Sequence, residues 1–185
     1  MGEQHKKHNR REHLNDFHLN VAGEYVYDGA LYACQNDDAK QRRSKRAVWG
    51  MAAILTVAVA AGGCIPAPGM QNCFYVLLPY LGEFLGAASV IWALAKLGMG
   101  WGTVREYNYK KSVAVLPVRT AVTAVFSLLG VVCELIFFFV NDHAGQTFFA
   151  LLYVLLKLIA LLSVLVLRAE IMQAEWGELP KKDNS

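Results

Sequence analysis

The chain has 185 residues, 55% of them hydrophobic, and a formal net charge of only +3. So small a charge gives little support to nucleic-acid binding, which depends on a strongly basic surface. The apolar residues are concentrated in long blocks after residue 46, and they are not spread at the period of a soluble helix or strand. Composition therefore favours an all-α membrane protein over a soluble domain.

Residues 1–46 form a polar segment, which predicts a cytoplasmic tail and not a cleaved signal peptide. Within it, residues 24–33 read EYVYDGALYA. Asp28 and Gly29 stand between two alternating aromatic runs, a pattern typical of a tight β-hairpin turn. A lone hairpin is only marginally stable in water. We therefore expect it to rest on the membrane surface, on the helix ends or on a partner, with an irregular segment as the alternative.

The tail ends in a basic run that directly precedes the first apolar block. Its basic residues are Lys40, Arg42, Arg43, Lys45 and Arg46. A basic residue near an anionic membrane surface contributes roughly 1 kcal/mol of attraction. The run therefore predicts contacts with lipid headgroups, and it also orients the first helix.

Four apolar segments predict transmembrane helices. Residues 47–82 contain no Lys, Arg, Asp or Glu, and they are too many for one span of about 20 residues. A Pro-Ala-Pro-Gly sequence at 66–69 divides them. We predict a transmembrane domain over 47–168, followed by a cytoplasmic tail over 169–185. Because the connections at the outer side are short, the first and second helices, and the third and fourth, should be antiparallel neighbours in a four-helix bundle. The predicted helices are 47–64, 74–95, 117–140 and 147–167.

The distribution of basic residues predicts the topology. Of the 18 Lys and Arg residues, nine precede residue 47, five lie within 96–119 and three lie from Arg168 onward. The connections 65–73 and 141–146 contain none. Cytoplasmic segments carry an excess of Lys and Arg. We therefore expect the chain to lie in the cytoplasmic membrane of the cell. Both termini and the 96–119 loop should face the cytoplasm. All four tryptophans fall at or near these ends: Trp49, Trp92, Trp101 and Trp176.

Three charges interrupt the apolar segments: Glu83, Glu134 and Lys157. A charge near the bilayer centre costs at least about 2.5 kcal/mol, so such residues usually face a partner or a wet cavity. At 1.5 Å per residue, Glu83 and Lys157 lie roughly 15 Å below the outer surface and Glu134 roughly 9 Å. Each lies on a stripe of small or polar residues at helical spacing. The stripes are Gly82, Glu83, Gly86, Ala87 and Val90; Thr120, Thr123, Ser127, Gly130 and Glu134; and Ala150, Tyr153, Lys157, Ala160 and Val164.

These stripes should face the bundle interior, where Lys157 pairs with Glu83, Glu134 or both. One interpretation is a buried ion pair that specifies helix packing. The other is a proton or ion relay, because two carboxylates around one ammonium leave one negative charge to protonate. Cys64 and Cys73 bracket the first outer connection, and in an oxidising compartment they could form a disulfide.

The sequence contains no Walker, HExxH, GxSxG or paired-Asp motif. We therefore predict no enzyme activity, no cofactor and no metal site. The predicted function is a non-enzymatic accessory or assembly subunit of a larger membrane complex, in contact with membrane lipid and with another membrane protein or a second copy. One alternative is a small oligomeric transporter or channel that uses Glu83, Glu134 and Lys157. Another is a membrane thiol oxidoreductase that uses Cys64 and Cys73.

Overall fold

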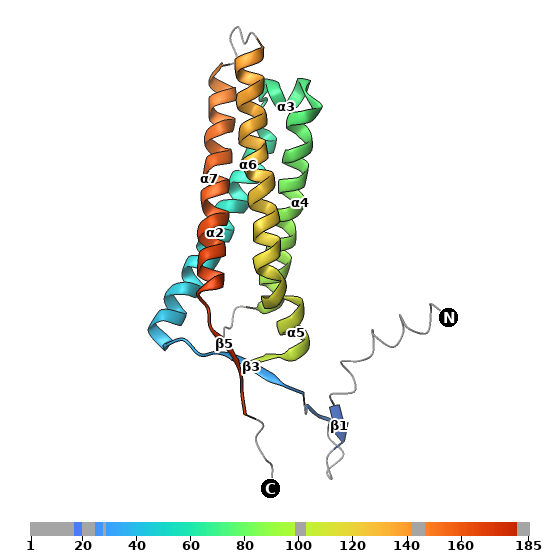
Figure 1. The fold of residues 1–185 in the computed structure, drawn as a ribbon, viewed down its shortest axis with the longest axis vertical. Coiled ribbons are helices and arrows are strands. Elements are labelled where there is room, and N and C mark those ends of the chain that lie inside the picture. Colours follow the sequence, from blue (N-terminus) through green and yellow to red (C-terminus); the bar gives the residue numbers. More distant parts are fainter. Residues whose placement is uncertain (1–16, 20–24, 28, 99–102, 142–146, 181–185) are drawn as a thin grey trace, which may run out of the picture.

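The structure is a computed structural model that describes residues 17–19, 25–27, 29–98, 103–141 and 147–180. Its long helices lie side by side in an elongated bundle (Figure 1). Within the described residues, four helices are long and apolar enough to cross a membrane. The predicted all-α membrane fold is therefore confirmed, and the chain has the architecture of a multi-pass membrane protein. The four helices are α2 (Asp38–Cys64), α4 (Phe74–Leu97), α6 (Leu116–Val140) and α7 (Thr147–Met172).

The packing order differs from the order along the chain. α2 packs mainly against α7, α4 packs mainly against α6, and α6 also packs against α7. α2 and α4 share fewer contacts, although a short connection joins them. That connection contains a further short helix, α3 (Pro68–Asn72), which packs on α4, α6 and α7. The first two helices are thus neighbours, as predicted, but the seam between them is the loosest between adjacent long helices.

Two helix boundaries were predicted wrongly. α2 begins at Asp38 and not at Ala47, and α7 continues to Met172 and not only to Leu167. The extra residues of α2 include Lys, Arg and Gln, which favour helix almost as strongly as Ala does. Hydropathy marks where the apolar layer ends, and a helix made of good helix formers continues beyond it.

A small N-terminal hairpin is present, as predicted, but it is not the one predicted over 24–33, since residues 25–27 pair with the segment before them and not with residues 31–34. Strand β1 (Phe17–Leu19) pairs with β2 (Tyr25–Tyr27) in an antiparallel ladder. The Asp-Gly sequence does not join two paired strands, because β3 (Leu31–Cys34) pairs with other segments. Cross-strand and tertiary contacts override a local turn preference when better partners lie elsewhere in the fold.

The central strand β3 lies between β4 (Val104–Arg105) and β5 (Trp176–Glu178), and both pairings are antiparallel. This three-stranded sheet joins the N-terminal tail, the loop after α4 and the segment after α7. It lies at one end of the bundle, beside α5 (Glu106–Lys111) and a 3₁₀ turn (Val113–Val115), while α3 lies at the other (Figure 1). We call these the sheet end and the α3 end.

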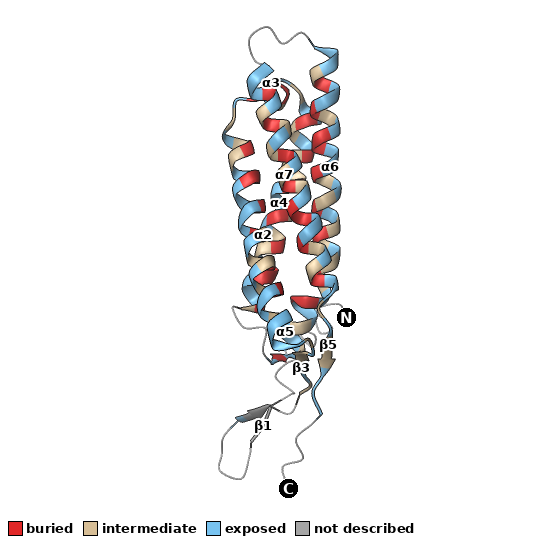
Figure 2. Cartoon of the chain, turned by 90° about the vertical axis from the view of Figure 1, so that its left-hand side faces the viewer, coloured by how far each residue is buried: buried red, intermediate tan, exposed pale blue. Residues whose placement is uncertain are grey.

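The bundle interior combines apolar side chains with many small and polar ones, while the outer helix faces carry bulky apolar side chains. Buried residues follow the inner helix faces (Figure 2). Every residue of the predicted stripes on α6 and α7 is buried, as are Glu83, Ala87 and Val90 on α4. Bulky residues such as Leu151, Phe84 and Leu162 are exposed. This arrangement suits a bilayer, where helices associate through close packing and polar contacts and not by hiding apolar surface.

Candidate functional site

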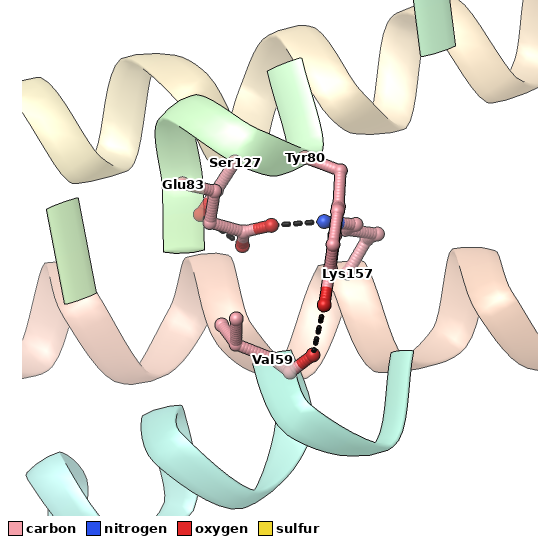
Figure 3. A network of polar contacts seen from close by, with 5 residues as sticks. All are labelled: Val59, Tyr80, Glu83, Ser127 and Lys157. Carbon is pink, nitrogen blue, oxygen red and sulfur yellow. Dashed lines mark hydrogen bonds and ion pairs between the residues drawn. The ribbon is translucent and has the colours of Figure 1, made fainter. Parts of the chain in front are cut away.

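The most distinctive feature of the interior is an ion pair between Lys157 on α7 and Glu83 on α4. The Lys157 ammonium donates to Glu83 Oε2, and the Ser127 hydroxyl on α6 donates to Oε1 at 2.6 Å (Figure 3). The Lys157 and Glu83 side chains are only 2% and 0% exposed. Both carboxylate oxygens therefore accept a hydrogen bond, and the contacts connect three of the four long helices.

Two tyrosine rings complete the surroundings of the ammonium. Lys157 Nζ lies 4.5 Å from the ring centroid of Tyr80 and 5.1 Å from that of Tyr153. A ring face at this distance attracts a cation, the more so when water is excluded. The Tyr80 hydroxyl also donates to the Val59 carbonyl at 3.4 Å (Figure 3). Through this bond α2 joins the network, so all four long helices contribute to it.

Small residues make room for these contacts. A Cβ atom at Gly130 would lie 3.6 Å from Cδ and Cε of Lys157, so the lysine side chain runs along the backbone of α6. A Cβ atom at Gly86 would lie 2.6 Å from the Thr123 hydroxyl oxygen and 3.3 Å from the Thr123 Cα. Gly82 likewise faces Phe126 of α6. The predicted Gly-x-x-x-Gly pair thus lets α4 and α6 approach closely.

Glu134 lies nearer the α3 end. It is fully buried on α6, and its carboxylate is packed against Gly69 in the first turn of α3, where a Cβ atom would overlap it. The direct hydrogen bond of Lys157, however, is to Glu83, one of the two predicted partners. The structure therefore separates an ion pair in the bundle centre from a second carboxylate beneath α3.

The other predicted site residues lie apart from this network. Cys64 is exposed, Cys73 is half-buried, and both are free thiols on either side of α3. The basic run occupies the first turns of α2. There Asp38, Ala39, Arg42, Arg43 and Arg46 line an open hollow of about 530 Å³. Among the residues that the structure describes, no group of three or more His, Cys, Asp or Glu side chains could hold a metal ion.

Sequence reasoning missed Tyr80 and the two arginine contacts nearer the sheet end. Tyr80 lies three residues before Glu83, which places both on one helix face, so this spacing could have indicated it. Arg119 donates to the Ser89 carbonyl on α4 at 2.6 Å, and Arg168 donates to the Pro117 carbonyl on α6. No sequence pattern indicates which carbonyl such an arginine would reach.

Comparisons of the chain with protein-family models, with curated proteins and with solved structures found no match. Function is therefore inferred from the fold and the site alone.

Proposed function

We propose that this chain is a non-enzymatic membrane subunit that supports the assembly of a larger membrane complex. The observation that carries the proposal is the sheet end, where segments from three distant parts of the sequence form one ordered sheet. A bundle that only filled space in the bilayer would need no such element. The partner is another membrane protein or a second copy of the chain.

The sheet is well supported on the bundle. The rings of Tyr32 and Tyr109 stack with centroids 4.3 Å apart, and Trp176 lies 6.1 Å from Tyr109. The Leu179 amide donates to the Leu31 carbonyl at 2.7 Å. The edges of the sheet are β4 and β5, and an edge strand is a template to which another chain can add a strand. Among the described residues, a supported sheet with β4 and β5 as its edge strands fits a docking role.

The ion pair supports the same proposal from inside the bundle. Glu83 accepts hydrogen bonds from both Lys157 and Ser127, so each charge of the pair is compensated inside the protein. In this proposal the pair fixes the relative positions of the helices. The predicted orientation, with the sheet end in the cytoplasm of a cell membrane, places the docking platform on the cytoplasmic side.

The test is the size of the particle extracted from the native membrane. The full-length chain is solubilised in a mild detergent and its mass is measured by light scattering, with Ala33→Pro as the variant. Ala33 lies in the central strand β3 and pairs with Gly177 of β5, and proline removes its amide and disrupts the sheet. We expect an assembly of fixed stoichiometry for the wild type, and its dissociation by Ala33→Pro with unchanged helical content. A wild-type monomer, or an assembly that Ala33→Pro leaves intact, would contradict the proposal.

A small oligomeric transporter or channel is the second candidate, because Glu83, Glu134 and Lys157 are ionisable groups buried in membrane helices. Such residues often mark ion pathways. Proteoliposomes with an internal pH dye separate the two candidates. As a subunit, the chain should leave the proton leak of the vesicles unchanged. A leak that Glu83→Gln abolishes in a folded protein would favour transport.

A further inference from the structure

Two hollows lie along α2, one charged and one apolar. The first is the hollow of about 530 Å³ at the start of the helix, which three arginines and Asp38 help to line. The second is a groove of about 150 Å³ between α2 and α4. Its lining residues are Trp49, Ala52, Ala53, Thr56, Ile91 and Leu94. The groove thus lies in the seam between α2 and α4, the adjacent long helices that pack least closely.

The two hollows share one stripe of the helix. Arg42, Arg46, Trp49, Ala53 and Thr56 follow one another at spacings of four, three, four and three residues, which places them on one face. At a rise of 1.5 Å per residue, Arg46 and Ala53 are about 10 Å apart along the axis. An elongated molecule with a charged head and an apolar tail would reach both.

The chemistry of each hollow is well defined. Arg42, Arg43 and Arg46 outnumber the single carboxylate of Asp38, so the first hollow favours an anion. Planar guanidinium groups bind phosphate oxygens in a forked geometry. In the groove, the Thr56 hydroxyl donates to the Ala52 carbonyl at 2.7 Å and is thus already satisfied. The rest of the lining is apolar except for the indole nitrogen of Trp49.

We propose that this face binds one anionic phospholipid, with its phosphate at Arg42 and Arg46 and an acyl chain in the α2–α4 groove. A partner helix about 10 Å wide is too thick for a groove of this size. A free phosphate would use the arginines and leave the groove empty. The lipid uses both hollows, and Trp49 lies between them at the level where indole rings prefer the membrane boundary.

The test is native mass spectrometry of the full-length chain in mild detergent, titrated with phosphatidylglycerol, phosphatidylcholine or glycerol phosphate. We expect one phosphatidylglycerol to bind at least about tenfold more tightly than either of the others, because only it combines net charge with acyl chains. Equal binding of phosphatidylcholine would overturn the proposal. So would full competition by glycerol phosphate, which would indicate a site for a free anion.

Matched variants test each half of the site. Arg46→Gln should weaken phosphatidylglycerol binding about fivefold, from the contribution of one basic residue. Lys110→Gln removes an exposed charge from α5, which lines neither hollow, and should leave binding unchanged. Equal losses in both variants would indicate general electrostatic attraction and overturn the site.

Ala53→Phe should fill the groove and weaken phosphatidylglycerol binding at least about fivefold, by excluding several methylene groups. Val57→Phe adds the same ring at an exposed position outside the groove and should have no effect. Ala53→Leu replaces Ala53→Phe if the larger ring lowers the helical content. Undiminished binding by a folded Ala53 variant would overturn the assignment of the groove.

Discussion

Lys157 lies at the centre of the polar network that connects the four long helices. Its ammonium contacts Glu83 and the rings of Tyr80 and Tyr153, and Tyr80 in turn reaches the Val59 carbonyl on α2. An uncompensated ammonium at this depth would cost several kcal/mol. The surrounding side chains are therefore best understood as the compensation that lets a lysine occupy the interior.

The glycines on the inner face of α4 should be sensitive to a single methyl group. Gly86→Ala would place a Cβ atom 3.3 Å from the Thr123 Cα, a backbone atom that cannot move aside cheaply. We expect it to lower the unfolding free energy by about 1–3 kcal/mol through overpacking.

Gly50→Ala is the matched control on α2, where nothing lies within 4 Å of an added Cβ atom. There the helix preference of alanine should raise stability by up to about 1 kcal/mol. Unfolding of both variants by SDS in mixed micelles measures the difference. Equal effects of the two substitutions would show that α4 and α6 do not pack closely at Gly86.

For single residues, the sequence indicates which helix faces are buried, but it does not indicate which side chains pair with one another. The stripes on α6 and α7 were predictable because a helix repeats every 3.6 residues and large apolar side chains occupied the other faces. The choice of Glu83 over Glu134 as the direct partner of Lys157 was not predictable. It depends on how far each helix is displaced along its neighbour, which spacing within one helix does not encode.

Among the elements, the long helices were predictable and the sheet was not. Continuous apolar segments identify spans directly, so α4 and α6 lie close to their predicted bounds. The sheet combines β3, β4 and β5, which are two to four residues long and far apart in sequence. Such short strands carry little pattern of their own, and their pairing depends on where the bundle places their ends.

The stacked aromatic residues should hold the sheet on the bundle. Tyr109→Ala removes the stacking on Tyr32 and the contact with Trp176, which together are worth about 1–3 kcal/mol. We expect faster hydrogen exchange at the amides of Leu179 and Glu106, which bond to the segment around β3. Amides in the middle of α6 should be unaffected. Unchanged exchange at Leu179 would mean that the sheet does not depend on the aromatic stack.

The whole molecule has two different ends, and the proposed topology assigns them to opposite sides of the membrane. The sheet end gathers the segments that carry most of the basic residues, whereas α3 covers the other end. This arrangement is consistent with the positive-inside distribution read from the sequence. The chain order alone could not show that the three basic segments form one sheet.

Cysteine accessibility tests this assignment in intact cells. Cys64 is exposed at the α3 end and should react with a membrane-impermeant maleimide added outside. A Lys110→Cys thiol at the sheet end, introduced together with Cys34→Ser, Cys64→Ser and Cys73→Ser, should react only after the cells are permeabilised. Labelling of both thiols from the same side would overturn the topology.

The buried ion pair of Lys157 and Glu83 fixes the relative positions of the helices. A double-mutant cycle on the free energy of unfolding tests this most directly. Glu83→Met and Lys157→Met should each lower the unfolding free energy by about 3–5 kcal/mol, because each leaves an uncompensated buried charge. The double variant should recover most of that loss. Lys110→Met, which breaks the exposed pair with Glu106, should cost less than about 1 kcal/mol. Single variants as stable as the wild type would contradict the account.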